Sequence, residues 1–126
     1  MKFLITESKL QNFFNKYLKK EHPHLGNLNP LPFTKTDNGE IYGYEFVEPD
    51  GIYMYFQYFM EDYDYDYLYD EQELEGFPKL VPTPKLMREL NGMFGDQSYD
   101  LFKNWFEETY KLPVKEVERR NENFNI

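Results

Sequence analysis

The sequence predicts an α+β fold, in which one helix precedes an antiparallel sheet of three or four strands and two helices follow it. Three observations support this prediction. Apolar residues recur at helical spacing near both ends of the chain, they alternate or run continuously through its middle, and turn-forming residues separate these segments. The length of 126 residues fits a single domain over residues 1–126, with a polar tail from about residue 118.

The first helix is expected to begin after Thr6, a preferred N-cap residue, and to end before Pro23, which cannot continue a helix. Its predicted apolar face consists of Leu10, Phe13, Phe14, Tyr17 and Leu18. His22 and His24 flank the proline, and two imidazoles at this spacing can reach one metal ion. Solvated histidines at a helix end are the more ordinary interpretation.

Turn residues divide the next part of the chain. Residues 25–32 are rich in Gly, Asn and Pro and predict a connecting loop. The Asp-Asn-Gly sequence at 37–39 favours a hairpin turn, because Asn-Gly accepts positive φ angles, and Pro-Asp-Gly at 49–51 predicts a second turn. Two consecutive hairpins imply an antiparallel sheet.

The strands between and after these turns differ in pattern. Residues 40–47 place Tyr42, Tyr44 and Phe46 on one face. Residues 52–60 are apolar or aromatic on both faces apart from Gln57. Such a pattern is typical of a central strand covered on each side.

The second helix is expected to have Thr83 as its N-cap, Pro84 as its first residue and Gly95 at its end. Its predicted apolar face is Leu86, Met87, Leu90, Met93 and Phe94.

The third helix is expected to be capped by Asp96 or Ser98 and to end before Pro113. Its predicted core face is Leu101, Phe102, Trp105, Phe106 and Tyr110. Residues 114–117 predict a short last strand, and residues 118–125 a frayed polar tail.

Composition excludes several classes of protein. An aromatic content of 20% provides enough apolar area for a folded core, unlike a disordered acidic tail. The absence of Cys excludes disulfides and thiolate metal sites. A net charge of −9 disfavours direct binding to nucleic acid or to anionic membranes. The chain shows neither a signal-peptide core nor a long apolar run, so we expect no secretion by a signal peptide.

The charge imbalance is concentrated in residues 61–75, which hold eight carboxylates and no Lys or Arg. Like charges at this density repel one another unless a cation or a basic partner faces them. As a strand, the segment would place Asp62, Asp64 and Asp66 on one face and Tyr63, Tyr65 and Tyr67 on the other. With Asp70, Glu71 and Glu73, these residues form the surface that we expect to contact a basic protein, in place of nucleic-acid phosphates. The alternative is an acidic strand that only discourages edge pairing, with the tyrosines in the core.

The same segment also partly matches a calcium-binding loop. The side chains at ligand positions are Asp62, Asp64, Asp66, Asp70 and Glu73, but Tyr67 stands where the loop of an EF-hand needs glycine. Bound Ca²⁺ is therefore an alternative, and we otherwise expect no cofactor. The D-x-D pattern of metal-dependent transferases is also present, but residues 36–78 contain no Lys or Arg to bind a phosphate. Because no nucleophilic triad or dyad is found, we expect no catalytic residues and no enzyme activity.

Four short stretches carry a resemblance: Leu4-Ile5-Thr6-Glu7-Ser8-Lys9-Leu10, Met93-Phe94-Gly95, Trp105-Phe106-Glu107-Glu108 and Leu112-Pro113-Val114-Lys115. Together they resemble small uncharacterised proteins encoded by large tailed bacteriophages. The resemblance implies a viral protein of the virion or the host cytoplasm, acting as a virion component or a host-takeover inhibitor. It supplies no binding residues. An immunity protein that neutralises a basic toxin is a further alternative, because it needs the same acidic surface.

Overall fold

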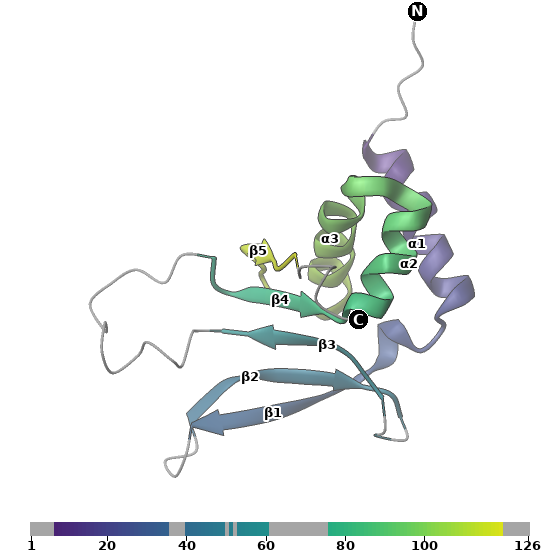
Figure 1. The fold of residues 1–126 in the computed structure, drawn as a ribbon. Coiled ribbons are helices and arrows are strands. Elements are labelled where there is room, and N and C mark those ends of the chain that lie inside the picture. The colour runs from purple at the N-terminus through teal and green to yellow at the C-terminus, as the bar shows by residue number, and fades with distance from the viewer. Residues whose placement is uncertain (1–6, 36–39, 50, 52, 61–75, 120–126) are drawn as a thin grey trace, which may run out of the picture.

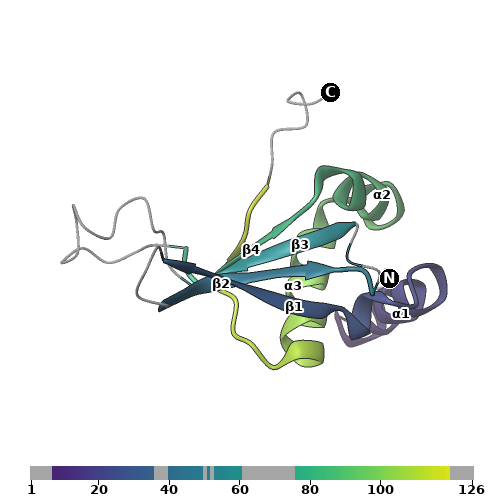
Figure 2. The same ribbon diagram turned by 90° about the horizontal axis from the view of Figure 1, so that it is seen from below.

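The computed structural model describes residues 7–35, 40–49, 51, 53–60 and 76–119, and its class is the predicted α+β (Figure 1). The helices are α1 (Glu7–Glu21), α2 (Pro84–Phe94) and α3 (Ser98–Tyr110), and the 3₁₀ turns are Leu25–Asn27 and Gly95–Gln97. The strands are β1 (Asn29–Lys35), β2 (Glu40–Val47), β3 (Met54–Phe59), β4 (Lys79–Pro82) and β5 (Glu116–Val117). Figures 1 and 2 show the helices gathered toward one end of the sheet.

The five strands lie in the order β1-β2-β3-β4-β5. The first three pairings are antiparallel, which confirms the two predicted hairpins. The predicted last strand is also present, but it pairs parallel to β4 rather than antiparallel. The reason is that α2 and α3 both lie between β4 and β5 in the sequence. The two helices return the chain to the end of the sheet where β4 begins, so β5 runs in the same direction as β4.

The predicted loop over residues 25–32 is confirmed only for residues 25–28, since β1 already begins at Asn29. Pro30 pairs with Phe46 and Pro32 with Tyr44. A proline has no backbone N–H and is tolerated in a strand mainly at a sheet edge. β1 is such an edge, because β2 is its one neighbour among the strands that the structure describes. The turn predicted at 37–39 lies outside the described residues, whereas the second turn is confirmed by Gly51, which has a φ of +78°.

The prediction that the central strand is covered on both faces was also wrong. β3 is central, between β2 and β4, but its burial alternates. Phe56 and Tyr58 are buried, whereas Tyr55, Gln57 and Phe59 on the other face are half-buried. The aromatic rings of α3 pack on the face of Phe56 and Tyr58. Within the part of the chain that the structure describes, the continuous run of aromatic residues therefore does not correspond to two buried faces.

The core is a cluster of aromatic rings between this face of the sheet and α3. Phe46 stacks on Phe56 at 4.8 Å between ring centroids, and Phe56 meets Phe102 edge-on at 5.4 Å. Tyr58 stacks on Phe106 at 5.4 Å. Each such pair contributes about 0.5–1.5 kcal/mol beyond the area that it buries. The predicted core face of α3 is confirmed.

The predicted faces of α1 and α2 each contain one exposed residue. Phe13 is 54% exposed and Met93 is 57% exposed. The two helices meet through Phe94, whose ring lies 5.1 Å from that of Phe14 and 5.7 Å from that of Tyr17. Only the part of each apolar arc that has a neighbouring element is buried, so periodicity alone predicts too wide a face.

The predicted helix boundaries are largely confirmed, but the capping contacts are not. α2 begins after Thr83, which makes no side-chain cap hydrogen bond, and ends at Gly95, which has a φ of +71°. Neither Asp96 nor Ser98 caps α3, because a 3₁₀ turn precedes the helix. The hydroxyl of Ser98 instead donates to Asn91 Oδ1. The N-cap predicted at residue 6 and the tail from residue 120 lie outside the described residues.

Candidate functional site

Residues 61–75 were expected to form the functional surface, and they lie outside the described residues. The individual residues predicted there are therefore outside them too. The predicted partner-binding residues are Asp62, Tyr63, Asp64, Tyr65, Asp66, Tyr67, Asp70, Glu71 and Glu73. The predicted calcium ligands among them are Asp62, Asp64, Asp66, Asp70 and Glu73. Their two attachment points are described. β3 ends at Phe59, β4 begins at Lys79, and these two residues are paired. The acidic segment therefore joins two neighbouring antiparallel strands.

This end of the β3–β4 pair lies away from the helices in both ribbon views (Figures 1 and 2). Lys79 Nζ lies 3.7 Å from Glu118 Oε1. Gly76 has a φ of +84°, a backbone conformation that favours glycine. Lys79 also pairs with Glu116 of β5, so strand pairing and the contact between Lys79 and Glu118 hold the start of β4 beside β5.

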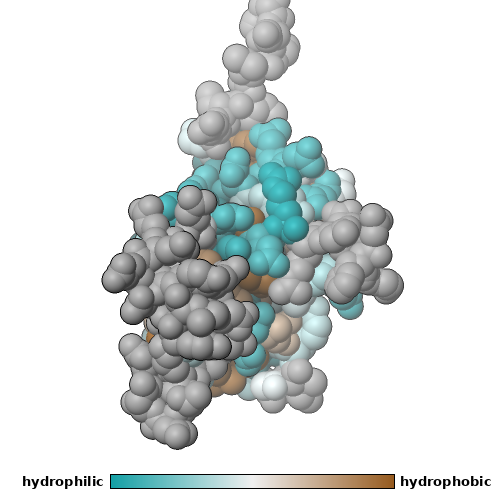
Figure 3. Space-filling view, turned by 60° about the vertical axis from the view of Figure 1, so that its left-hand side comes forward, coloured by the Kyte–Doolittle hydropathy of each residue, from teal (hydrophilic) through white to brown (hydrophobic). Residues whose placement is uncertain are grey.

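The described surface on this side of the molecule is mostly hydrophilic (Figure 3). Hydrophobic residues emerge there only in small separate places. Large contiguous apolar patches mark many protein interfaces.

A second group of polar residues joins α1 to α2, and we call Tyr17, His22 and Glu89 the Glu89 cluster. The hydroxyl of Tyr17 donates to Glu89 Oε2 at 2.5 Å. His22 Nε2 lies 2.8 Å from the same oxygen. These contacts connect residues that are about seventy positions apart in the chain. The side chain of His22 is only 19% exposed, so the prediction of a solvated histidine at the helix end was wrong for this residue.

The pKa values of the Glu89 cluster reflect this geometry. Burial alone would raise the pKa of Glu89, but hydrogen bonds from Tyr17 and His22 and the nearby charge of Lys85 lower it overall. The hydrogen bond to Glu89, together with burial, raises the pKa of Tyr17 to about 12. Tyr17 therefore stays protonated and Glu89 ionised at neutral pH. The arrangement is that of a structural contact between helices.

His24, the other histidine of the predicted pair, is exposed. His22 uses its Nε2 for Glu89, so the structure does not bring the two histidines together as a metal-binding pair. Within the described ranges, no group of three or more His, Cys, Asp or Glu side chains is placed to hold a metal ion.

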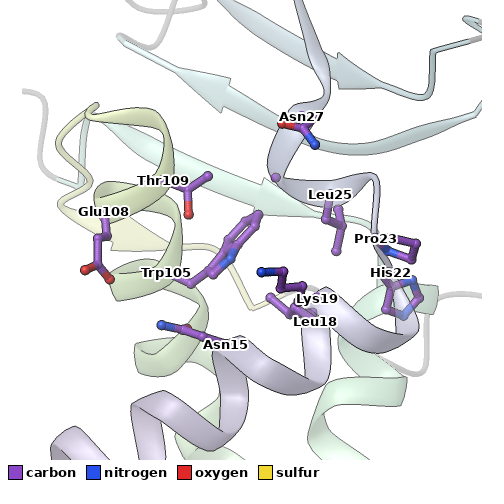
Figure 4. A pocket seen from close by; sticks show the side chains of 11 residues that line it. Asn15, Leu18, Lys19, His22, Pro23, Leu25, Asn27, Trp105, Glu108 and Thr109 are labelled. Atoms are coloured by element: carbon purple, nitrogen blue, oxygen red, sulfur yellow. The ribbon is translucent and has the colours of Figure 1, made fainter.

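A cavity of about 390 Å³ lies between the end of α1, the Leu25–Asn27 turn and α3 (Figure 4). Its apolar lining includes Leu18, Leu25 and Trp105, and Lys19, Asn27 and Glu108 bring polar groups to it. Trp105 was expected to lie in the core, and a cavity was not expected. No periodicity could have revealed it, because the space depends on how the turn after α1 approaches α3.

Comparison with protein-family models, with curated proteins and with solved structures finds no match for this chain. No helix in the described part of the chain has the length and apolar character needed to cross a membrane.

Proposed function

We propose that this protein is a small acidic interaction protein without enzymatic activity, which presents residues 61–75 to a basic surface of another protein. One observation carries the proposal. Eight carboxylates, unaccompanied by any Lys or Arg, occupy a single connection between two paired strands of a packed sheet. The proposed contact residues are Asp62, Tyr63, Asp64, Tyr65, Asp66, Tyr67, Asp70, Glu71 and Glu73.

The chemistry of this segment suits a basic partner. Clustered carboxylates accelerate encounter with a positive surface, and tyrosine is enriched where protein interfaces are buried. Both ends of the segment are attached to paired strands, so the entropy cost of bringing these ends together is already part of folding. Binding does not add this cost, whereas a free tail has no such constraint before it binds. A row of carboxylates resembles a row of phosphates, so the partner is proposed to use a surface that otherwise binds nucleic acid.

The proposed origin is a tailed bacteriophage, and the proposed role is that of a virion component or of an inhibitor in the host cytoplasm. This part rests on the resemblance of the four stretches named above. The same physics would serve an immunity protein that neutralises a basic toxin. Gene neighbourhood distinguishes these three roles, because virion operons, early host-takeover clusters and toxin loci contain different genes.

The test removes charge from the segment without removing side-chain volume. We compare D62N/D64N/D66N with a control that carries Glu21→Gln, Asp96→Asn and Asp100→Asn, three exposed residues elsewhere. Both variants change the net charge from −9 to −6. Proteins captured from bacterial lysate are quantified at low and high salt. We expect the captured partner to be lost from the first variant only, and to be weakened by salt. Equal capture by the two variants would contradict the proposal.

The alternative of a structural calcium site rests on the spacing of Asp62, Asp64, Asp66, Asp70 and Glu73. Thermal melting with and without Ca²⁺ tests it, because an ion that binds only the folded state raises Tm. If Ca²⁺ is bound, the rise in Tm should disappear in Asp64→Asn and persist in Asp96→Asn. A wild-type protein whose Tm does not respond to Ca²⁺ would remove this alternative.

A further inference from the structure

We propose that the cavity between α1 and α3 binds a small aromatic molecule that carries one oxygen acceptor, as a carboxylate or a carboxamide. The site is separate from residues 61–75, and it does not depend on the function proposed for them. Its volume of about 390 Å³ lies within the range of about 300–1,000 Å³ that is usual for small-molecule sites.

The indole of Trp105 is the residue that points to a ligand. Trp105 is only 7% exposed, and it lines the cavity (Figure 4). Its N–H group donates to no other described residue, and it is not fully buried, so solvent reaches it. In the free protein a water molecule can accept from this N–H. A ligand oxygen placed in the cavity would replace that water as the acceptor, and the apolar body of the ligand would fill the rest of the space.

The packing around Trp105 fixes the direction of this donor. Its ring stacks on Phe102 at 5.5 Å between centroids and meets Tyr110 edge-on at 6.0 Å. Tyr110 is held in turn, because its hydroxyl donates to the Leu25 carbonyl at 2.5 Å and accepts from the Leu28 N–H at 3.0 Å. A donor that is fixed before binding loses little entropy when a ligand arrives.

The other lining residues define the body and the charge of the ligand. Leu18 and Leu25 are almost fully buried and offer an apolar wall, which favours a hydrocarbon or aromatic body. Lys19 is exposed at the cavity and favours a single negative charge. Glu108, on the facing helix α3, disfavours a second negative charge on the ligand, because like charges repel. A phosphate dianion is therefore disfavoured, and a monocarboxylate or an uncharged carboxamide fits the site.

Trp105 is the only tryptophan of the chain, so its fluorescence reports binding directly. The full-length protein is titrated with phenylacetate, phenylacetamide and benzylamine, the last of which is similar in size but lacks an oxygen acceptor. We expect a saturable change in the emission of Trp105 with the first two probes and none with benzylamine. No saturable change with either oxygen-bearing probe, or an equal change with benzylamine, would overturn the proposal.

Variants then separate the contacts. Lys19→Gln should weaken the binding of phenylacetate about threefold and leave the binding of phenylacetamide unchanged. Lys16→Gln on the same helix is the matched control, and it should change neither affinity. Trp105→Phe keeps a ring but removes the N–H, and calorimetry should show at least about tenfold weaker binding of both probes. Thr109→Phe is a second test that does not require Trp105→Phe to fold. Its larger side chain fills the cavity from the lining, so it should abolish binding of both probes. Unchanged binding of the probes to Thr109→Phe would place them elsewhere and overturn the proposal.

Discussion

The aromatic core and the helical corner of this protein are stabilised in different ways. The core consists of rings from β2, β3 and α3, such as Phe56, which is fully buried among them. The helical corner, where α1 and α2 meet, is defined here by Tyr17, His22, Glu89, Thr83 and Gly95. It contains hydrogen bonds to a carboxylate that is 38% exposed, a buried hydroxyl with no hydrogen-bond partner among the described residues, and a glycine with positive φ.

The difference shows where the stability of a small domain comes from. Apolar packing at the core is non-directional and scales with the area removed from water. Contacts at the corner exchange hydrogen bonds with water for hydrogen bonds within the protein, so each contributes little in net terms. The core should therefore determine whether the protein folds, and the corner how the helices are set on the sheet.

The largest expected effect comes from opening the core. Phe56→Ala should lower the free energy of unfolding by about 3–5 kcal/mol, because it removes a buried ring and leaves a cavity that its neighbours fill only partly. Phe13→Ala is the control, since Phe13 is 54% exposed and its replacement should cost less than about 1 kcal/mol. Urea unfolding measures both. Similar losses for the two variants would contradict the assignment of the core to this face of the sheet.

The two glycines around the end of α2 should respond in opposite directions to alanine. Gly95 has a φ of +71° and a ψ of −159°, a conformation nearly restricted to glycine, so Gly95→Ala should cost about 1–3 kcal/mol. Gly92 lies within α2, and no atom lies within 4 Å of an added Cβ. Gly92→Ala should therefore gain about 0.5–1 kcal/mol from helix propensity. Chemical denaturation distinguishes the signs, and a loss in both variants would place the strain elsewhere.

Removing the charge of the Glu89 cluster should have a smaller effect. Glu89→Gln keeps an oxygen that accepts from Tyr17 but loses the ion, so we expect a loss of about 1 kcal/mol at neutral pH, limited by solvent screening. Exposed Glu108→Gln, in the same assay, is the control. An equal loss in both variants would show that the corner does not depend on the cluster.

The pH dependence of the same variant gives an independent reading. The pKa of Glu89 is lowered in the folded state, so its contribution to stability is present above its ordinary pKa and is lost as the pH falls. The pKa of Tyr17 is raised from 10.0 to about 12, so its contribution is complete below pH 10 and is lost toward pH 12. Glu89→Gln should reduce both slopes. Tyr110, whose pKa burial raises to about 12, should keep its alkaline contribution.

Much of the fold could be predicted because apolar spacing is local. The core face of α3 follows from residues a few positions apart, and Phe102 and Phe106 are buried as expected, whereas the aromatic run of β3 wrongly predicted two covered faces. The strand status of Asn29 and Pro30 was missed, because proline is acceptable there only at an edge, and position within a sheet is not a local property. The parallel pairing of β5 was missed for the same reason.

The candidate sites were predictable to different degrees. Composition alone identified residues 61–75 as the acidic segment, and the functional role of that segment stays a prediction. The Glu89 cluster and the Trp105 cavity could not be predicted, since each brings together side chains from segments far apart in the chain. His22 showed only a helix-end pattern. Its contact with Glu89 depends on the packing of α1 against α2, which sequence spacing does not report.

The smallest expected effect tests the unpartnered hydroxyl of the corner. Thr83 Oγ1 is buried and has no hydrogen-bond partner among the described residues. The backbone of Thr83 is already satisfied, because its N–H donates to the Tyr55 carbonyl at 3.0 Å and its carbonyl accepts from the Met87 N–H at 3.1 Å. Thr83→Val keeps both bonds and replaces the hydroxyl with a methyl group.

Since replacing an unsatisfied buried group with an apolar one of the same shape is neutral or favourable, Thr83→Val should gain about 0.5 kcal/mol. Thr83→Ser is the matched control, because it keeps the hydroxyl and removes the methyl group, so it should be destabilising. Urea unfolding of the two variants distinguishes the contributions. A loss of stability in Thr83→Val as large as that in Thr83→Ser would mean that the hydroxyl is hydrogen-bonded in solution, and that the corner is more polar than the described contacts indicate.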